Sequence, residues 1–238
     1  MKTVAVIPAA GAGMRMLSEV AKQFLELEGN PLLAVTLANF ERCADVESVF
    51  VVAPADWVPY CQERIVSRYG LSKVRQVVPG GERRQDSVRL GLEAARGEFD
   101  LALIHDGVRP FAEPEFLSRI VRAASRNRAV VPVLPLKETI KEVGKDGCVV
   151  GTVKRGSLRL VQTPQAFRFE DILSAHRRAE DEKWEEMTDD ALLLERLGIP
   201  ITVVEGLEEN IKITTPYDLE LARFILSRRR SYHESTKQ

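Results

Sequence analysis

Two cations, Arg15 and Lys22, lie in or just after a run of small residues near the start of the chain. The run reads PAAGAGMRM over residues 8–16 and continues to KQF at residues 22–24. Small residues let a ligand approach backbone amides closely, and the two cations supply positive charge beside them. The run lacks the third glycine of a dinucleotide fingerprint and the Gly-Lys-Ser/Thr of a P-loop. It therefore predicts a nucleoside triphosphate site, with a purely structural turn as the alternative.

The elements around this run determine where it lies in the fold. Residues 4–7 are apolar and directly precede it, which is typical of a buried parallel strand. Further apolar runs alternate with helical patterns, and we expect strands at 49–53, 74–78, 101–104, 129–134 and 201–204. Helices are expected at 31–41, 57–69, 83–95, 114–125, 170–179, 189–197 and 216–227. The alternation predicts an α/β protein with a Rossmann-like, mostly parallel sheet flanked by helices.

Residues 137–162 break the alternation. A glycine-containing segment, residues 144–147, separates two β-prone runs at 139–143 and 148–150, which predicts a β-hairpin. An isolated hairpin is only marginally stable in water, so we expect it to project from the sheet and pack on a second subunit. Packing against its own domain is the alternative. Residues 1–230 are thus expected to form one domain that carries the arm 137–162, followed by a polar tail, 231–238.

Composition limits the class of protein. The 238 residues are 45% hydrophobic, which suffices for a sizeable core. A net charge of -1 argues against the broad basic face that nucleic acid requires. Cys43, Cys61 and Cys148 are widely spaced, which favours a reducing compartment without disulfides or zinc. With no leader-like start and no apolar span of about 20 residues, we expect a soluble cytoplasmic protein that binds neither nucleic acid nor membrane.

Four later polar segments follow strands or begin helices, at 79–87, 105–110, 162–165 and 209–214. Ligands bind at the carboxyl ends of the strands in open α/β sheets, so we expect these segments to meet the first run there. Together they resemble the 2-C-methyl-D-erythritol 4-phosphate cytidylyltransferase family of the nonmevalonate isoprenoid pathway. The motifs that carry the resemblance are, in order, PAAGxGxRM, KQF, GGxxRxxSV, HDxxRP, TPQ and NIKIT. The resemblance extends over residues 4 to about 225.

The resemblance implies that CMP is transferred from CTP to the phosphate of methylerythritol phosphate, with release of pyrophosphate and with Mg²⁺. The attacking phosphate oxygen is already largely deprotonated at pH 7, because the second pKa of a phosphomonoester is about 6. No protein nucleophile or strong general base is therefore required. Catalysis then depends on orientation and on neutralising charge at the phosphates.

The same resemblance assigns roles to individual residues. Arg15 and Lys22 match the transition-state stabilisers of the family. The CTP side would comprise Ala9, Ala10, Gly11, Gly13, Gly80, Gly81, Glu82, Ser87, Asp106 and Gly107, and Asp106 would also meet Mg²⁺ together with the CTP phosphates. The sugar phosphate would bind to Arg109, Thr139, Arg155, Thr163, Thr188 and Lys212. Arg155 lies in the arm, so the arm of a partner in a homodimer would complete the site; an exposed arm arginine is the alternative.

Three alternative functions remain open. They are a ribitol 5-phosphate cytidylyltransferase, a sugar-phosphate nucleotidyltransferase that uses UTP or another base, and a noncatalytic nucleotide-binding sensor. The PAAG opening favours methylerythritol phosphate as the acceptor, and the complete set of matched cations favours an enzyme. Lys154 replaces an aspartate that is common before Arg155 and alters the charge near the sugar phosphate. His105 is expected to be structural, and only His176 and His233 accompany it, so a histidine metal cluster is not expected.

Overall fold

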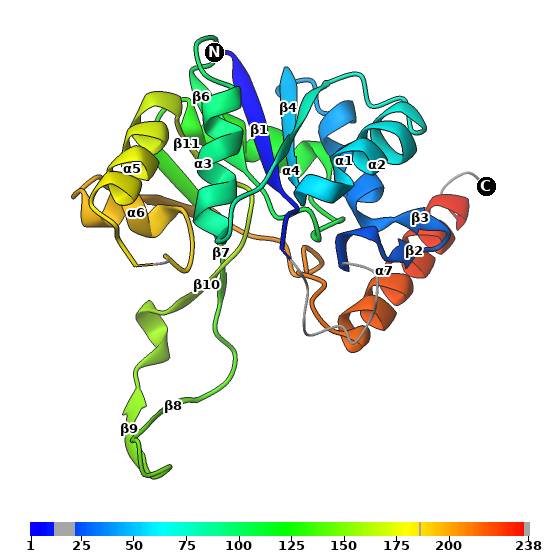
Figure 1. Cartoon of the computed structure of the whole chain (residues 1–238). Coiled ribbons are helices and arrows are strands. Elements are labelled where there is room, and N and C mark those ends of the chain that lie inside the picture. Colours follow the sequence, from blue (N-terminus) through cyan, green and yellow to red (C-terminus); the bar gives the residue numbers. More distant parts are fainter. Residues whose placement is uncertain (12–21, 186, 236–238) are drawn as a thin grey trace.

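A mostly parallel sheet forms the centre of the molecule. The computed structural model of the chain describes residues 1–11, 22–185 and 187–235. The strand order is β10-β7-β11-β6-β1-β4-β5, and β12 pairs with β7 (Figure 1). The strands are β1 (Thr3–Pro8), β4 (Ser48–Ala53), β5 (Val74–Pro79), β6 (Leu101–Ile104), β7 (Ala129–Pro135), β10 (Arg159–Val161), β11 (Gln165–Arg168) and β12 (Thr202–Glu205). The predicted α/β class is confirmed.

Alternate residues of β1 enter two separate cores, one on each face of the sheet. Ala5 and Ile7 pack with α1 (Leu32–Arg42) and α4 (Pro114–Ala124), whereas Val4 and Val6 pack with α3, α5 and α6. The last three helices are α3 (Arg84–Ala94), α5 (Phe169–Asp181) and α6 (Ala191–Arg196). Burial on both faces explains why the parallel strands are continuous apolar runs in the sequence.

A smaller core lies beneath the C-terminal helix. Helix α7 (Pro216–Ser235) packs through Ala222 and Ile225 on Leu27 and Phe111, near the short ribbon of β2 (Glu26–Leu27) and β3 (Asn30–Pro31). It extends beyond residue 227, where the predicted helix ends. Helix α2 (Val58–Tyr60) continues in π-helical geometry over Cys61–Ser67, within the predicted helix 57–69. Among the described helices, none has the length and apolar character needed to cross a membrane.

Two antiparallel strands were not expected from the sequence. β11 lies between β6 and β7 and is antiparallel to both, and β10 pairs with the end of β7. Both strands are too short to show a clear alternation, and Pro164 between them interrupts the pattern. Because β11 runs against its neighbours, its first residue lies at the edge where the parallel strands end. Residues 162–165 therefore reach that edge, as predicted, by an unexpected route.

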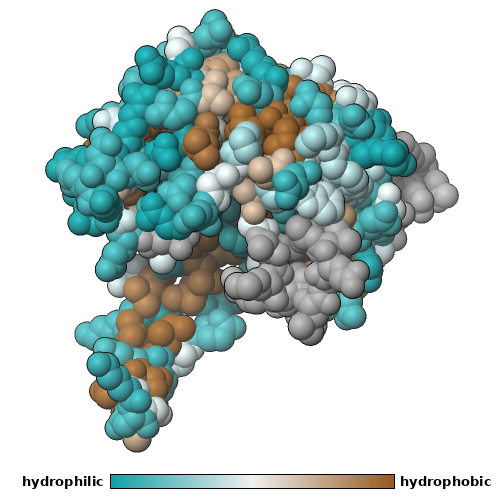
Figure 2. Space-filling model, viewed as in Figure 1, coloured by the Kyte–Doolittle hydropathy of each residue, from teal (hydrophilic) through white to brown (hydrophobic). Residues whose placement is uncertain are grey.

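The predicted hairpin is confirmed as an arm. β8 (Ile140–Val143) pairs antiparallel with β9 (Val149–Val153), and the pair projects well beyond the sheet (Figure 1). Val143, Val149 and Val150 are 56%, 60% and 63% exposed. Figure 2 shows apolar residues gathered along the arm and where it leaves the sheet. Such clustered apolar exposure is typical of an interaction surface rather than of scattered surface residues.

Candidate active site

The turns that follow the strands are joined by backbone hydrogen bonds at the carboxyl edge of the sheet. The Ala9 amide donates to the Val52 carbonyl over 2.7 Å, and the Gly80 amide donates to the Ala53 carbonyl over 2.8 Å. The buried Gln23 side chain donates from Nε2 to the Ala9 carbonyl, at 2.6 Å. Gln23 was not among the predicted site residues, although it follows Lys22 directly in the KQF motif. This hydrogen bond joins the residue after Lys22 to the first turn. Residues 12–21, between the two, lie outside the described residues.

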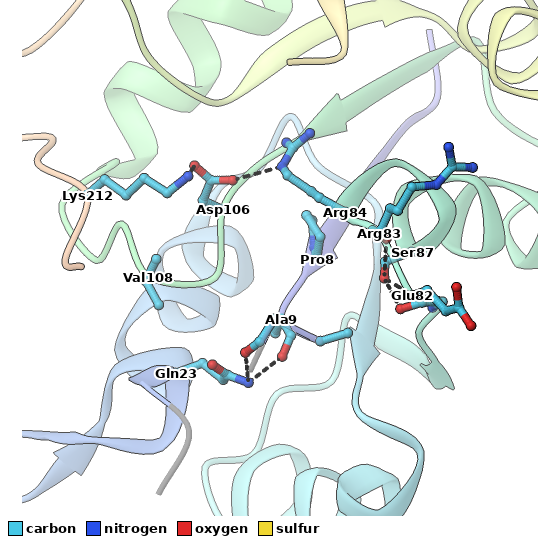
Figure 3. A pocket seen from close by; sticks show the side chains of 13 residues that line it. Pro8, Ala9, Gln23, Glu82, Arg83, Arg84, Ser87, Asp106, Val108 and Lys212 are labelled. Atoms are coloured by element: carbon cyan, nitrogen blue, oxygen red, sulfur yellow. Dashed lines mark hydrogen bonds and ion pairs between the residues drawn. The ribbon is translucent and has the colours of Figure 1, made fainter. Parts of the chain in front are cut away.

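A first pocket of about 280 Å³ opens between these turns (Figure 3). Of the residues predicted to meet CTP, those that line it are Ala9, Ala10, Gly11, Gly81, Glu82, Ser87 and Asp106. Gly80 lies behind the lining, where a Cβ would overlap with Ala10 and lie 2.9 Å from Ser87 Oγ. A Cβ on Gly107 would lie 3.2 Å from the Cβ of Ala9. These two glycines permit close packing of the turns rather than facing the pocket.

Two of the residues predicted from the first run lie outside the described residues. They are Arg15, predicted to be catalytic, and Gly13, predicted to bind CTP. Lys22 begins a short 3-10 turn, Lys22–Phe24, whose backbone is described while the Lys22 side chain is not.

The start of helix α3 forms one wall of the first pocket. Ser87 Oγ accepts the Gly81 amide hydrogen at 3.1 Å, which fixes the glycine turn against the helix. Asp86 accepts the Arg83 amide hydrogen at 3.0 Å and so caps the helix start. The N-terminus of a helix presents unpaired N–H groups and a positive dipole, which favour an anion at this position.

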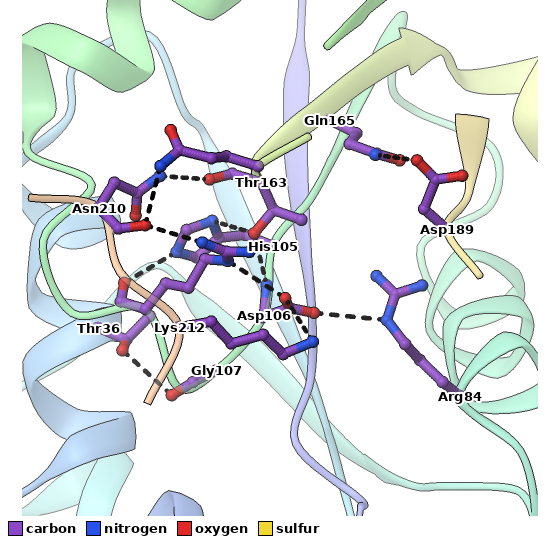
Figure 4. Close-up of polar contacts among 12 residues, drawn as sticks. Thr36, Arg84, His105, Asp106, Gly107, Thr163, Gln165, Asp189, Asn210 and Lys212 are labelled. Atoms are coloured by element: carbon purple, nitrogen blue, oxygen red, sulfur yellow. Dashed lines mark hydrogen bonds and ion pairs between the residues drawn. The ribbon is translucent and has the colours of Figure 1, made fainter. Parts of the chain in front are cut away.

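Three cations surround the Asp106 carboxylate (Figure 4). Its Oδ1 lies 3.4 Å from Arg84 Nε, and its Oδ2 lies 3.3 Å from Arg109 Nε and 3.1 Å from Lys212 Nζ. Burial alone would raise the pKa of Asp106, but Arg84, Lys212 and Arg109 lower it far below its usual value. Asp106 is therefore ionised at neutral pH, and its cluster carries a net positive charge.

His105 supports the loop that carries this cluster. Its pKa is lowered to about 4, chiefly because the side chain is fully buried, so the ring is neutral near pH 7. Nε2 lies 3.0 Å from the Arg109 carbonyl, which only accepts, so Nε2 carries the proton. Nδ1 therefore accepts from Thr163 Oγ1 at 3.0 Å, and that oxygen accepts the Asp106 amide hydrogen at 3.1 Å. The predicted structural role of His105 agrees with this network.

A second pocket of about 470 Å³ adjoins the first. The two pockets share Arg84, Asp106 and Lys212 in their linings. Of the residues predicted to bind the sugar phosphate, the second pocket is lined by Arg109, Thr163, Thr188 and Lys212. Thr139 and Arg155 are absent from both linings within the described chain. Both are exposed on the arm, where Arg155 donates to the Lys137 carbonyl.

Arg84 is a site residue that the sequence reading did not single out. It is part of the GGxxRxxSV motif and begins helix α3, yet nothing in the spacing indicates which carboxylates it meets. Its Nη2 lies 2.8 Å from Asp190 Oδ2, in addition to the contact with Asp106. Its position at the boundary of both pockets becomes evident only in the folded chain.

Asp106 fits a Mg²⁺ ion that the phosphates of a bound substrate also hold. Among the described residues, no group of three or more His, Cys, Asp or Glu side chains could hold a metal by itself. Asp106 lies where the two pockets meet, and Mg²⁺ is commonly held by one or two carboxylates together with substrate phosphates.

A pocket lined by glycine turns, beside a pocket that three cations line, at the carboxyl edge of an α/β sheet fits a nucleotidyltransferase. The family model of 2-C-methyl-D-erythritol 4-phosphate cytidylyltransferase matches residues 3–228. A protein of this name from Geobacter metallireducens is 48% identical over 225 residues, which cover 93% of this chain and 96% of the relative. The chain belongs to the 2-C-methyl-D-erythritol 4-phosphate cytidylyltransferase family, which confirms the resemblance found in the motifs.

Solved structures agree with this assignment. The 4-diphosphocytidyl-2C-methyl-D-erythritol synthase from Anaerococcus prevotii has a TM-score of 0.82 and 31% identity, and the match covers 95% of this chain and 98% of that one. The 2-C-methyl-D-erythritol 4-phosphate cytidylyltransferase from Thermus thermophilus has a TM-score of 0.76 and 36% identity, with 93% and 98% covered.

Proposed function

We propose that the chain transfers CMP from CTP to 2-C-methyl-D-erythritol 4-phosphate, giving 4-diphosphocytidyl-2-C-methyl-D-erythritol and pyrophosphate in isoprenoid precursor biosynthesis. The observation that carries this proposal is the contact between two pockets of different character. The first is lined in part by the small residues of the turns after β1 and β5. The second combines three cations, two threonine hydroxyls and three carboxylates: Arg84, Arg109, Lys212, Thr163, Thr188, Asp106, Asp189 and Glu195. A nucleotide in the first and a phosphomonoester in the second would meet at the Asp106 cluster.

The charges at this junction suit the reaction. Arg84, Arg109 and Lys212 supply three positive charges, and Asp106 and Asp190 supply two negative ones, so the group has a net charge of about +1. A partly dehydrated cationic site attracts phosphate and stabilises negative charge that develops during transfer. Arg109 and Lys212 bind the acceptor phosphate in this proposal, with Thr163 and Thr188 as further donors.

The nucleotide is bound largely by backbone groups. Gly81, Glu82 and Ser87 read the cytosine and hold the ribose, and Ala9, Ala10 and Gly11 line the triphosphate side, with Gly80 and Gly107 packed behind. Arg15 and Lys22 stabilise the charge that forms at the α-phosphorus and on the departing pyrophosphate, a role taken from the family motif. Gly13 completes the triphosphate turn. The acceptor phosphate is already deprotonated, so none of these side chains needs to remove a proton.

Mg²⁺ is the cofactor in this proposal, and Asp106 is the residue that holds it together with the CTP phosphates. The ion would supply positive charge that neutralises the CTP phosphates. Asp106 would help to hold the ion, and Arg84 and Lys212 keep its carboxylate at the junction.

A homodimer completes the acceptor site in this proposal, and the enzyme acts in the cytoplasm. Thr139 and Arg155 match the acceptor residues of the family, yet both lie on the arm and away from the second pocket of their own chain. The arm also exposes Val143, Val149 and Val150. An arm that reaches a second copy would bury these valines and deliver Thr139 and Arg155 to that copy's acceptor pocket.

The test is release of pyrophosphate from CTP with Mg²⁺ and each candidate acceptor. We expect turnover with methylerythritol phosphate, little with ribitol 5-phosphate, and little when UTP replaces CTP. Comparable turnover with ribitol 5-phosphate would reassign the acceptor, and turnover with UTP would reassign the nucleotide. CTP binding without turnover of any acceptor would indicate a nucleotide sensor.

A further inference from the structure

A row of polar side chains extends from the junction of the two pockets into the protein. Arg84 Nε lies 3.4 Å from Asp106 Oδ1, and Arg84 Nη2 lies 2.8 Å from Asp190 Oδ2. On the far side, Asp190 Oδ1 lies 3.2 Å from Nε2 of His176 on α5. The Asp190 and His176 side chains are each 1% exposed, and neither residue lines either pocket of the described chain. Through Arg84, the row connects the buried Asp190 and His176 side chains to the wall that both pockets share.

Stability alone does not account for this row. Burying an ion pair gives little net stability, because both groups lose their water. Helices α3 and α5 are joined elsewhere by Glu93 and Arg177, whose Oε2 and Nη2 atoms lie 2.5 Å apart. They also share an apolar core that includes Leu92 and Ile172. The Asp190 carboxylate instead fixes the orientation of the planar Arg84 guanidinium, which can bind two carboxylates at once.

The orientation of Arg84 affects both half-sites, because Arg84 lines both pockets. Its contact with Asp106 holds the carboxylate at the junction from one side, while Lys212 and Arg109 hold it from the other. Asp190 is also the N-cap residue of helix α6 and lies two residues after Thr188, which lines the second pocket. One carboxylate thus fixes the wall between the pockets and the turn that forms part of the second.

We propose that Asp190, supported by His176, is a positioning residue for the transfer reaction. It holds Arg84 against Asp106 so that the nucleotide and the acceptor meet in one geometry. This inference rests on the proposed function. Asp190 and His176 touch neither substrate and act through Arg84. A misplacement of about 1 Å near reacting groups can cost about 100-fold in rate. Loss of Asp190 therefore lowers kcat, with smaller changes in the KM of either substrate.

The experiment compares purified variants in the pyrophosphate-release assay with CTP and methylerythritol phosphate. For Asp190→Asn we expect kcat to fall by about 10- to 100-fold, with each KM within about threefold of the wild type. His176→Leu lowers kcat in the same way, and His176→Gln, which keeps an N–H donor, restores most of it. Glu93→Gln is the matched control, because it removes an ion pair between α3 and α5 away from the pockets and leaves kcat unchanged.

A double-mutant cycle tests whether Asp190 acts through Arg84. Arg84→Lys replaces the planar fork with a single ammonium, and Asp190→Asn on that background should cost much less than it does alone. Additive losses, or a folded Asp190→Asn enzyme with wild-type kcat, would overturn the inference. So would an equal loss of kcat in Glu93→Gln.

If Asp190→Asn does not fold, the two His176 variants decide the matter. Low kcat in His176→Leu with recovery in His176→Gln supports the inference, and equal kcat in both overturns it. A wild-type protein that binds CTP but turns over no acceptor overturns the proposed function, and the positioning role falls with it. If the wild type is active and Asp190→Asn and His176→Leu keep its kcat, only the positioning role is overturned.

Discussion

Substituting Gly80 with alanine tests how tightly the nucleotide turn packs. A Cβ at this position would overlap with the Cβ of Ala10 and lie 2.9 Å from Ser87 Oγ. Because non-bonded carbons rest about 3.5–4.0 Å apart, Ala10 must move by roughly 1 Å towards the first pocket. Overpacking of this kind costs about 1–3 kcal/mol of unfolding free energy. If Ala10 lines the nucleotide, the same shift lowers kcat/KM for CTP by about 10- to 100-fold.

The matched control is Gly91→Ala on helix α3. There a Cβ would lie 2.5 Å from Val6 Cγ1 and 2.8 Å from Val52 Cγ2, which both belong to the core and do not line the first pocket. We expect a similar loss of stability in urea unfolding, with little change in the kinetics of the folded enzyme. The assay is steady-state pyrophosphate release with CTP varied at saturating acceptor. A folded Gly80→Ala enzyme with wild-type kcat/KM for CTP would refute the reasoning, as would an equal kinetic loss in Gly91→Ala.

Lys22→Ala should abolish most turnover while urea unfolding changes little, because the proposed role of Lys22 is to neutralise charge during transfer; equal losses of activity and stability would contradict that role. Arg155→Ala and Lys212→Ala should each be nearly inactive alone, yet mixing them should restore about a quarter of wild-type activity, since half of the dimers are mixed and hold one intact site. No recovery on mixing, with subunit exchange verified, would place Arg155 in its own chain's site. Burial alone would raise the pKa of Asp218, but hydrogen bonds from Thr214 and Thr215 outweigh this effect, so the pKa lies below its usual value. The ionised carboxylate therefore stabilises the start of α7 above about pH 4, and this stabilisation is lost as the pH falls below that value. Asp218→Ala should therefore lower the unfolding free energy by about 1 kcal/mol at pH 7, and urea unfolding at pH 3 should show a much smaller difference.

The first pocket could be predicted in large part, because its residues follow strands whose ends share one edge. Ala9 and Gly11 follow β1, Gly81 follows β5, and Asp106 follows β6. Parallel strands bring such turns together whatever the details of the helices. Local sequence therefore carries most of the information about this half of the site.

The second pocket depends on information that local sequence does not hold. Asp189 and Asp190 are adjacent acidic residues that look equivalent in the sequence. In the fold, Asp189 accepts from Gln165 at 2.7 Å, whereas Asp190 meets Arg84. These partners are far apart along the chain, and their pairing follows from the insertion of β11, which is too short to predict. Arg155 depends further still on a second chain, so its sequence position alone cannot place it.

The position of β11 has a consequence for the order of folding. β6 and β7 do not pair directly, and β11 is the strand that lies between them. The first half of the sheet, β5-β4-β1-β6, can therefore pair while the chain is being synthesised, but β7 cannot join it until residues 165–168 have left the ribosome. Contacts between distant residues form slowly, because loop closure must precede them. Until then β6 presents an unpaired edge, and the interval is lengthened by the synthesis of the whole arm that separates β7 from β11.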